Sequence, residues 1–136
     1  MKAATAAPRW FVVDDESMIR NLAELILRRF SDADVHACAD AHEALDCMST
    51  APTGDLELVV TDLNMPGMSG LELARRVRAF APRAKVLLTT GSAIDLPDER
   101  TLRAQGVDLL LPKPFGVGEL LAAVRRLCGP ERCRLN

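Results

Sequence analysis

The strongest constraint on the fold of this chain is a regular alternation between short apolar runs and longer segments with helical spacing. The apolar runs lie at residues 10–13, 56–60, 85–88 and 108–111. Short, largely apolar runs without a polar residue at every second position are typical of strands covered on both faces. A fifth strand, at residues 35–38, is predicted only from its place between two helical segments, because its own strand propensity is weak.

The segments between these runs carry the signals of amphipathic helices. Apolar side chains recur at offsets of three and four in three of them. These segments are residues 19–30, 71–77 and 120–127. A fourth helix is predicted from a capping-box sequence that begins at Asp40, and a similar box at Ser69 precedes the second periodic segment. A fifth helix should open near Pro97 and end before Gly106.

The order of these elements predicts the fold class. A strand followed by a helix, repeated five times with short connections, implies right-handed crossovers and a parallel sheet with helices on both faces. We therefore expect an open, doubly wound α/β fold. In such folds the functional site lies outside the carboxyl ends of the strands, near the point where strand order reverses.

Composition narrows the class of protein further. The chain has 136 residues, 49% of them hydrophobic, which suits one globular domain. Its 17 basic and 19 acidic residues give a net charge of −2, so a broad basic surface and direct nucleic-acid binding are not expected. No secretory signal or membrane-spanning run is apparent, so we expect a cytoplasmic protein without membrane contact. The four cysteines form no CxxC pair and are expected to be reduced thiols.

Polar residues capable of chemistry follow four of the predicted strands. They are Asp14, Asp15 and Glu16, then Thr61, Asp62 and Asn64, then Thr89, Thr90 and Gly91, and finally Lys113. Carboxylates gathered at one sheet edge repel one another unless a cation compensates them. Mg²⁺ suits a site with few carboxylates, because waters and phosphate oxygens complete its coordination.

The same inventory suits phosphoryl transfer to a carboxylate. One carboxylate acts as nucleophile, while the cation, the lysine and a threonine hydroxyl stabilise charge on the phosphoryl oxygens. Taken singly, each residue has a simpler interpretation as a helix cap or a turn residue. Lys113 is less easily explained as a surface residue, because Pro112 and Pro114 hold its backbone extended and delay the last helix to Gly116 or later.

Four motifs together resemble the receiver domain of two-component response regulators. The motifs are Val12-Val13-Asp14-Asp15-Glu16, Thr61-Asp62-Leu63-Asn64-Met65-Pro66-Gly67-Met68-Ser69-Gly70, Leu88-Thr89-Thr90-Gly91 and Lys113-Pro114-Phe115. They appear in the order and at the spacing of that family, and the similarity covers about residues 9–128. The resemblance implies a flavodoxin-like (βα)₅ fold with strand order 2-1-3-4-5.

The resemblance also assigns roles to individual residues. It makes Asp62 the phosphoacceptor and places Thr90 and Lys113 against the phosphoryl oxygens. It gives Mg²⁺ the ligands Asp15, Asp14 through water, Asp62, and the backbone carbonyl of Asn64. The protein would then be a signalling domain and not an enzyme, beyond catalysing its own phosphorylation and dephosphorylation.

One position departs from the family pattern. The switch aromatic expected three residues before the lysine is Leu110 here, and the chain contains no tyrosine. This substitution leaves the phosphorylation chemistry intact but puts the usual aromatic readout in doubt. We interpret Leu110 as a core residue.

The expected organisation is an N-terminal extension (residues 1–8), a receiver domain (9–128) and a C-terminal tail (129–136) too short for an output domain. The expected phosphodonor is a histidine kinase or histidine phosphotransfer protein. Output would pass to an unknown protein through the surface of the fourth helix, fifth strand and fifth helix, which is also a candidate homodimer face. The chain suits either a single-domain response regulator or the receiver of a hybrid histidine kinase.

Two alternatives use similar residues. A haloacid dehalogenase-type phosphatase needs a second catalytic carboxylate two residues after the nucleophile, where this chain has Asn64, which has no proton to give as a general acid. A pseudo-receiver would bind proteins on the same fold without taking phosphate. The intact set of acidic, hydroxyl and lysine residues argues against it.

Overall fold

Five parallel strands form the central sheet of the computed structural model, which describes residues 7–50, 53–92 and 96–134. The strands are β1 (Arg9–Val13), β2 (Asp34–Cys38), β3 (Leu56–Asp62), β4 (Lys85–Thr90) and β5 (Leu109–Pro112). Their order across the sheet is β2-β1-β3-β4-β5, and each neighbouring pair is parallel. The predicted strand order and the weak strand at residues 35–38 are both confirmed.

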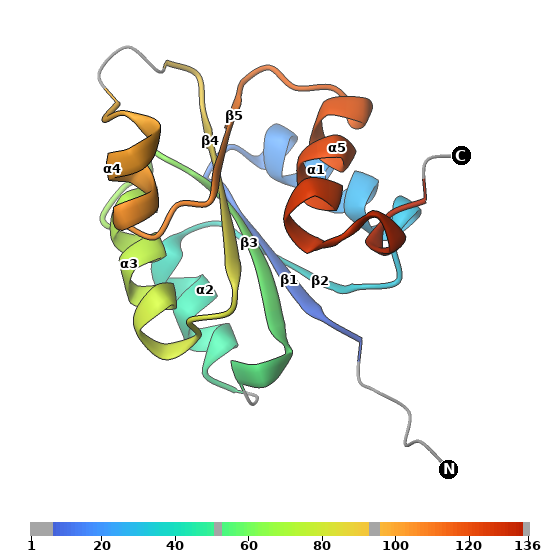
Figure 1. Ribbon diagram of the computed structural model, residues 1–136, viewed down its shortest axis with the longest axis horizontal. Helices are drawn as coiled ribbons and strands as arrows, with labels where there is room; N and C mark the ends of the chain where they lie inside the picture. Colours follow the sequence, from blue (N-terminus) through green and yellow to red (C-terminus); the bar gives the residue numbers. More distant parts are fainter. Residues whose placement is uncertain (1–6, 51–52, 93–95, 135–136) are drawn as a thin grey trace.

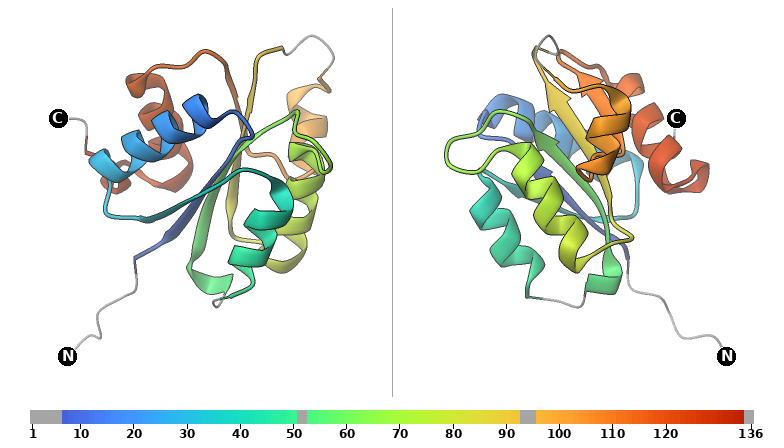
Figure 2. Two further views of the ribbon diagram at one scale, coloured as in Figure 1. Left: turned by 180° about the vertical axis from the view of Figure 1, so that it is seen from behind. Right: turned by 60° about the vertical axis from the view of Figure 1, so that its left-hand side comes forward.

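Helices cover both faces of this sheet (Figure 1). They are α1 (Ser17–Phe30), α2 (Ala41–Met48), α3 (Gly70–Phe80), α4 (Glu99–Ala104) and α5 (Val117–Cys128). Helices α2, α3 and α4 pack on one face, and α1 and α5 pack on the other, as the two further views in Figure 2 also show. No helix among the described residues is long and apolar enough to cross a membrane.

Strand β1 shows why the strand sequences lack polar alternation. Phe11 and Val13 belong to the core beneath α2, α3 and α4, whereas Trp10 and Val12 belong to the core beneath α1 and α5. All four side chains are buried. Successive side chains of a strand point to opposite faces, so the central positions of a strand between two helical layers are apolar on both faces.

The predicted start signals of three helices are confirmed by hydrogen bonds. The side chains of Asp40, Ser69 and Asp98 each accept from the backbone N–H three residues on. The reciprocal half of the capping box differs from expectation, because the Glu43 carboxylate accepts from the N–H of Ala39 instead of Asp40. These caps satisfy N–H groups that have no partner inside the helix.

Two strands are longer than predicted. Thr61 and Asp62 are the last residues of β3, and Thr89 and Thr90 end β4, although we expected all four to follow their strands. The ladder continues because Asp62 is paired with Thr89, and Thr90 with Pro112. These four residues are therefore held within the sheet and not in the loops that follow it.

The C-terminal residues 130–134 pack near the amino ends of the strands, at the end of the sheet opposite to these site residues. Cys133 is buried in the α1/α5 core, and the backbone N–H of Arg134 donates to the carbonyl of Phe30 at 2.6 Å. Arg134 and Pro8, near the two ends of the described chain, line one shared pocket. This segment was expected to be a tail, and its packing was not anticipated.

Candidate functional site

Asp14 lies at the carboxyl end of β1, where the chain leaves the sheet for α1. Its side chain is buried, and its residue exposure is 3%. Its N–H donates to the carbonyl of Cys38 at 3.2 Å, and its Oδ1 accepts from the N–H of Glu16 at 2.9 Å. The two bonds turn the chain sharply and keep the Asp14 carboxylate at the sheet edge.

Asp62 occupies the neighbouring position, at the end of β3, and is 6% exposed. The backbone after it is fixed, because the Leu63 N–H donates to Thr89 and the Leu63 carbonyl accepts from Gly70, both at 2.9 Å. Gly70 approaches so closely that an added Cβ would lie 2.3 Å from the carbonyl oxygen of Asp62. Only glycine allows the N-terminus of α3 to lie this near Asp62.

Lys113 brings its ammonium group to these carboxylates from the end of β5. Its Nζ lies 3.0 Å from Oδ2 of Asp14, 3.2 Å from Oδ1 of Asp62 and 3.5 Å from Oε1 of Glu16. Its backbone N–H donates to the carbonyl of Thr90 at 2.8 Å. After it, α5 begins at Val117, so the predicted delay of this helix to Gly116 or later is confirmed.

The protonation equilibria of the two central groups reflect this crowding. Burial raises the pKa of Asp62, the Lys113 charge opposes that shift, and the Asp14 charge adds to it, so the net direction is upward. Burial disfavours the charged form of Lys113, but its hydrogen bonds to Asp14 and the charges of Asp14 and Asp62 outweigh burial and raise its pKa. The lysine is therefore held as a cation between two carboxylates.

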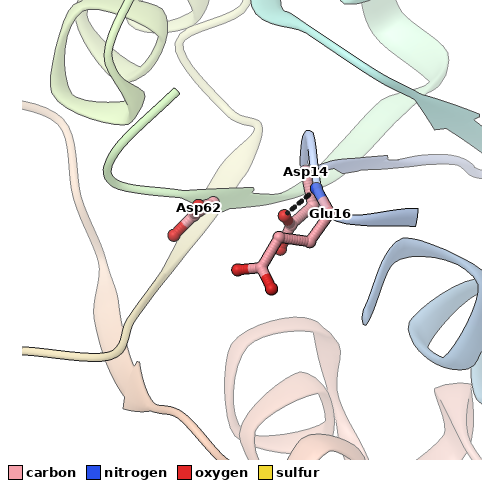
Figure 3. A group of neighbouring side chains, drawn as sticks. All are labelled: Asp14, Glu16 and Asp62. Atoms are coloured by element: carbon pink, nitrogen blue, oxygen red, sulfur yellow. Dashed lines mark hydrogen bonds between the residues drawn. The ribbon is translucent and has the colours of Figure 1, made fainter. Parts of the chain in front are cut away.

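Asp14, Glu16 and Asp62 form a group in which one carboxylate oxygen of each residue lies within 4.8 Å of those of the other two (Figure 3). Glu16 was noted among the carboxylates after the first strand but was not assigned to the site. The sequence feature that could have assigned Glu16 to the site is its position directly after the Asp14-Asp15 pair. Asp15, which the resemblance makes a metal ligand, is exposed and is not part of this group.

The other predicted site residues lie at the same sheet edge but make different contacts. The Thr90 hydroxyl is buried at the end of β4, where it donates to the carbonyl of Ser92 at 2.9 Å. Thr89 is buried, and its hydroxyl donates to the carbonyl of Thr61 at 3.4 Å. Asn64 is exposed in the loop after Asp62. Leu110 is partly buried and packs against the core beneath α2, α3 and α4.

Comparison with known proteins shows the family to which this chain belongs. The family model described as "Response regulator receiver domain" matches residues 11–125. The alkaline phosphatase synthesis transcriptional regulatory protein SphR of Synechococcus elongatus is 36% identical over 132 residues, which cover 92% of this chain and 50% of SphR. The response regulator MprA of Mycolicibacterium vanbaalenii is also 36% identical, over 88% of this chain and 49% of MprA. The chain thus spans about half the length of these curated relatives.

Solved structures show the same fold over nearly the whole chain. The chemotaxis protein CheY4 of Vibrio cholerae superposes with a TM-score of 0.77 at 28% identity, covering 90% of this chain and 99% of CheY4. A CheY-like receiver domain protein of Methanospirillum hungatei gives a TM-score of 0.78 at 26% identity, covering 89% of this chain and 93% of that protein. The match of the family model and of the fold identifies this chain as a member of the response regulator receiver domain family of two-component signalling.

Proposed function

We propose that the domain accepts a phosphoryl group on Asp62 in a Mg²⁺-dependent reaction and thereby switches its contacts with other proteins. The observation that carries this proposal is the position of the Lys113 ammonium, within 3.2 Å of both the Asp14 and Asp62 carboxylates. A cation fixed beside a buried carboxylate at the carboxyl edge of a parallel sheet suits the binding of an anionic group there.

The donor set fits Mg²⁺. Three clustered carboxylates carry more negative charge than Lys113 neutralises, and hard oxygen ligands are those that Mg²⁺ prefers. The ligands that we propose are Asp14, Asp15 and Asp62 together with the backbone carbonyl of Asn64. When bound, the ion would neutralise charge on the phosphoryl oxygens.

The reaction that these residues support is nucleophilic substitution at phosphorus. An Oδ atom of ionised Asp62 forms the new O–P bond while the P–N bond to the histidine of the donor breaks, and the bonding electron pair stays on the imidazole nitrogen. Lys113 already lies beside Asp62 and stabilises the negative oxygens of the transferring group. Asp62 must be ionised to attack, so its raised pKa predicts that phosphorylation slows in acid.

The Thr90 hydroxyl is the proposed link from site to surface. Its present acceptor is the carbonyl of Ser92 in the loop after β4. Phosphorylation adds about −1.5 to −2 charges and three acceptor oxygens, which compete for this hydroxyl. If the hydroxyl donated to the phosphoryl group instead, the Ser92 carbonyl would lose this hydrogen bond and the α4–β5–α5 face would change. Leu110 would take part in this change in place of the family's aromatic side chain. That face would bind the downstream protein or a second copy of the chain.

An apolar surface beside the site supports a protein as phosphodonor. On α1, Met18 is 84% exposed, Leu25 65% and Leu22 45%. A groove next to them reaches Lys113 itself. It is lined by Ile19, Leu22, Gly91, Lys113, Pro114 and Phe115. A histidine kinase or a histidine phosphotransfer protein is the donor that we propose for this surface.

Intact-mass spectrometry after incubation with acetyl phosphate tests the proposal. We expect one phosphoryl adduct in the wild type with Mg²⁺ and none with EDTA. Asp62→Asn should abolish the adduct, and Asp46→Asn, which changes an exposed carboxylate on α2, should keep it. An adduct of undiminished size in Asp62→Asn would refute the assignment. If neither acetyl phosphate nor a cognate kinase labelled the wild type, the domain would be a phosphate-independent pseudo-receiver.

A further inference from the structure

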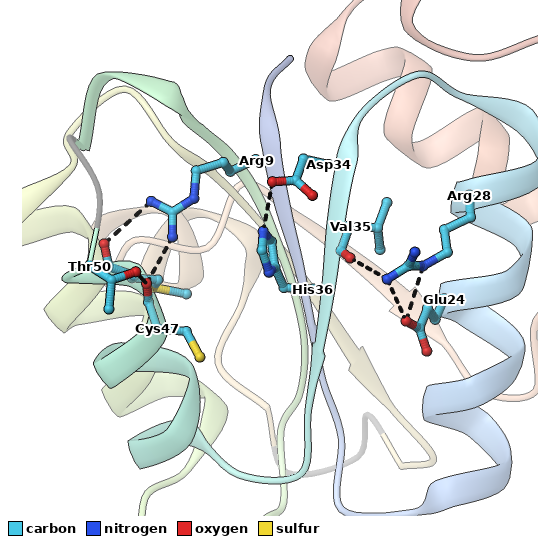
Figure 4. Close-up of polar contacts among 9 residues, drawn as sticks. Arg9, Glu24, Arg28, Asp34, Val35, His36, Cys47 and Thr50 are labelled. Carbon is cyan, nitrogen blue, oxygen red and sulfur yellow. Dashed lines mark hydrogen bonds and ion pairs between the residues drawn. The ribbon is translucent and has the colours of Figure 1, made fainter. Parts of the chain in front are cut away.

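Helix α1 carries two arginines that make the same contact at different ends of the helix. Nη1 of Arg20 donates to the carbonyl of Asp14 at 2.8 Å. Nη2 of Arg28 donates to the carbonyl of Val35 at 2.8 Å (Figure 4). The first contact is made at the candidate site and the second at the far end of the helix. The contact of Arg28 therefore serves as an internal control for the effect of the Arg20 contact on the site.

The carbonyl that Arg20 binds lies where β1 ends and the site loop begins. Asp14 is held there by three bonds: its N–H to Cys38, its Oδ1 to the N–H of Glu16, and its carbonyl to Arg20. Asp14 and Glu16 supply two of the three clustered carboxylates. Among the residues that the structure describes, the Arg20 bond is the one hydrogen bond from a side chain of α1 to this loop.

The two arginines differ in how their charge is compensated. Arg28 forms an ion pair with Glu24 at 2.9 Å. Within residues 7–50, 53–92 and 96–134, Arg20 has no ion pair of this kind. The printed contact of Arg20 near the site is therefore the one with the backbone carbonyl of Asp14, and Arg20 contacts none of the three clustered carboxylates directly as an ion pair among these residues.

We propose that Arg20 is a positioning residue for phosphoryl transfer to Asp62. It acts through the backbone of Asp14 and keeps the Asp14 and Glu16 carboxylates beside Asp62, without touching the phosphoryl group itself. The proposal rests on the function proposed above for Asp62. Small displacements of groups around a reacting centre are costly, because catalysis by charged groups depends on their being placed before the reaction.

The test compares Arg20→Gln with Arg28→Gln, since each variant loses one arginine-to-carbonyl bond of equal length. The first measurement is the initial rate of labelling by acetyl phosphate at saturating Mg²⁺. We expect the rate to fall roughly tenfold in Arg20→Gln, as for loss of one charged hydrogen bond, and to stay at the wild-type value in Arg28→Gln. Arg20→Lys keeps a charged donor and should recover most of the rate.

The second measurement needs neither metal nor phosphodonor. Amide hydrogen exchange reports the bond from the Glu16 N–H to Asp14, and we expect this exchange to accelerate in Arg20→Gln but not in Arg28→Gln. Equal labelling rates in wild type and Arg20→Gln, or equal losses in both glutamine variants, would overturn the proposal. If the wild type took no phosphoryl group, the function proposed for Asp62 would fail, and unchanged Glu16 exchange would separately refute the positioning role. If Arg20→Gln did not fold, Arg20→Met would be compared with Arg28→Met in the same two measurements. Equal labelling rates in these two variants, or unchanged Glu16 exchange in Arg20→Met, would then refute the role.

Discussion

The sheet has an amino edge, where the amino ends of the parallel strands lie, and a carboxyl edge, where their carboxyl ends lie. Charged side chains are paired differently at these two edges. At the amino edge, Glu57 accepts from Nε1 of Trp10 at 3.0 Å and from two nitrogens of Arg132 at 3.0 and 2.8 Å. At the carboxyl edge, one lysine serves three carboxylates, two of which are buried. Charge is thus matched to partners at one edge and left in excess at the other.

Arg9 shows how thoroughly charge is matched at the amino edge. This buried arginine donates to the carbonyl of Cys47 (Figure 4) and to that of Met48, both at the C-terminus of α2. Its guanidinium lies 5.3 Å from the centre of the Phe11 ring. Cations are favourable at the C-terminus of a helix. We therefore expect paired charge at the amino edge to contribute to stability, and the excess of carboxylates at the carboxyl edge to lower stability in the absence of the proposed cation.

The first prediction tests whether the carboxyl edge is tightly packed despite its mismatched charge. Gly70→Ala would place a Cβ 2.3 Å from the Asp62 carbonyl oxygen and 2.8 Å from Cδ1 of Leu88, so α3 must move. We expect a loss of roughly 3 kcal/mol in the free energy of unfolding, measured by urea denaturation. Gly118→Ala is the control, because nothing lies within 4 Å of its added Cβ. Equal stability of the two variants would show that the edge is loosely packed.

The second prediction removes the matched charge at the amino edge. Glu57→Leu leaves Nε1 of buried Trp10 and the guanidinium of Arg132 without their acceptor, and we expect a loss of roughly 2 kcal/mol by urea denaturation. Glu57→Gln should lose less, since its Oε1 can still accept from Trp10. A Glu57→Leu variant as stable as wild type would mean that matching charge at this edge is not stabilising.

The third prediction is a gain in stability on removal of a charge at the carboxyl edge. Asp62→Asn should raise the free energy of unfolding at neutral pH without Mg²⁺. Burial raises the pKa of Asp62 above its ordinary 3.8, so between the two values the folded state binds more protons and stability falls as pH rises. The gain in the free energy of unfolding from Asp62→Asn is full above the pKa of Asp62 in the folded state and disappears below 3.8. Urea denaturation of both proteins at several pH values measures it. A destabilised Asp62→Asn at neutral pH would contradict the proposed excess of negative charge.

The smallest expected effect comes from adding Mg²⁺. Binding at tenfold excess over Kd stabilises by about 1.4 kcal/mol, so Tm should rise by a few degrees in wild type and return with EDTA. Asp15→Asn should raise the Kd for Mg²⁺ more than Glu16→Gln does, as the family resemblance implies. The reverse order would assign the ligand position to Glu16, in agreement with the carboxylate group in the structure.

Local patterns were sufficient to predict most of the fold. Alternation located even β2, whose sequence is a poor strand signal, and the caps at Asp40, Ser69 and Asp98 are set by residues three positions apart. The ends of β3 and β4 were misplaced, because polar side chains at the site end of a strand look like the start of a loop. Their pairing depends on the neighbouring strand and not on local sequence.

Within the site, Asp14, Asp62 and Lys113 were correctly brought together by the rule that strand ends converge. The parts that were missed depend on contacts distant in sequence. Glu57 and Arg132 lie 75 positions apart, so no local pattern reveals that the C-terminal segment packs against β3. The contact of Arg20 with a backbone carbonyl leaves no sequence signal, because any residue provides a carbonyl.

The shared pocket of Pro8 and Arg134 has a practical consequence. Pro8 and Arg134 both lie at the amino edge, while the phosphodonor that we propose would approach Asp62 at the carboxyl edge. A fluorophore, an affinity tag or a fused protein joined at either position would start on the side away from Asp62. We therefore expect that partners fused at these two positions would leave the proposed phosphorylation site accessible.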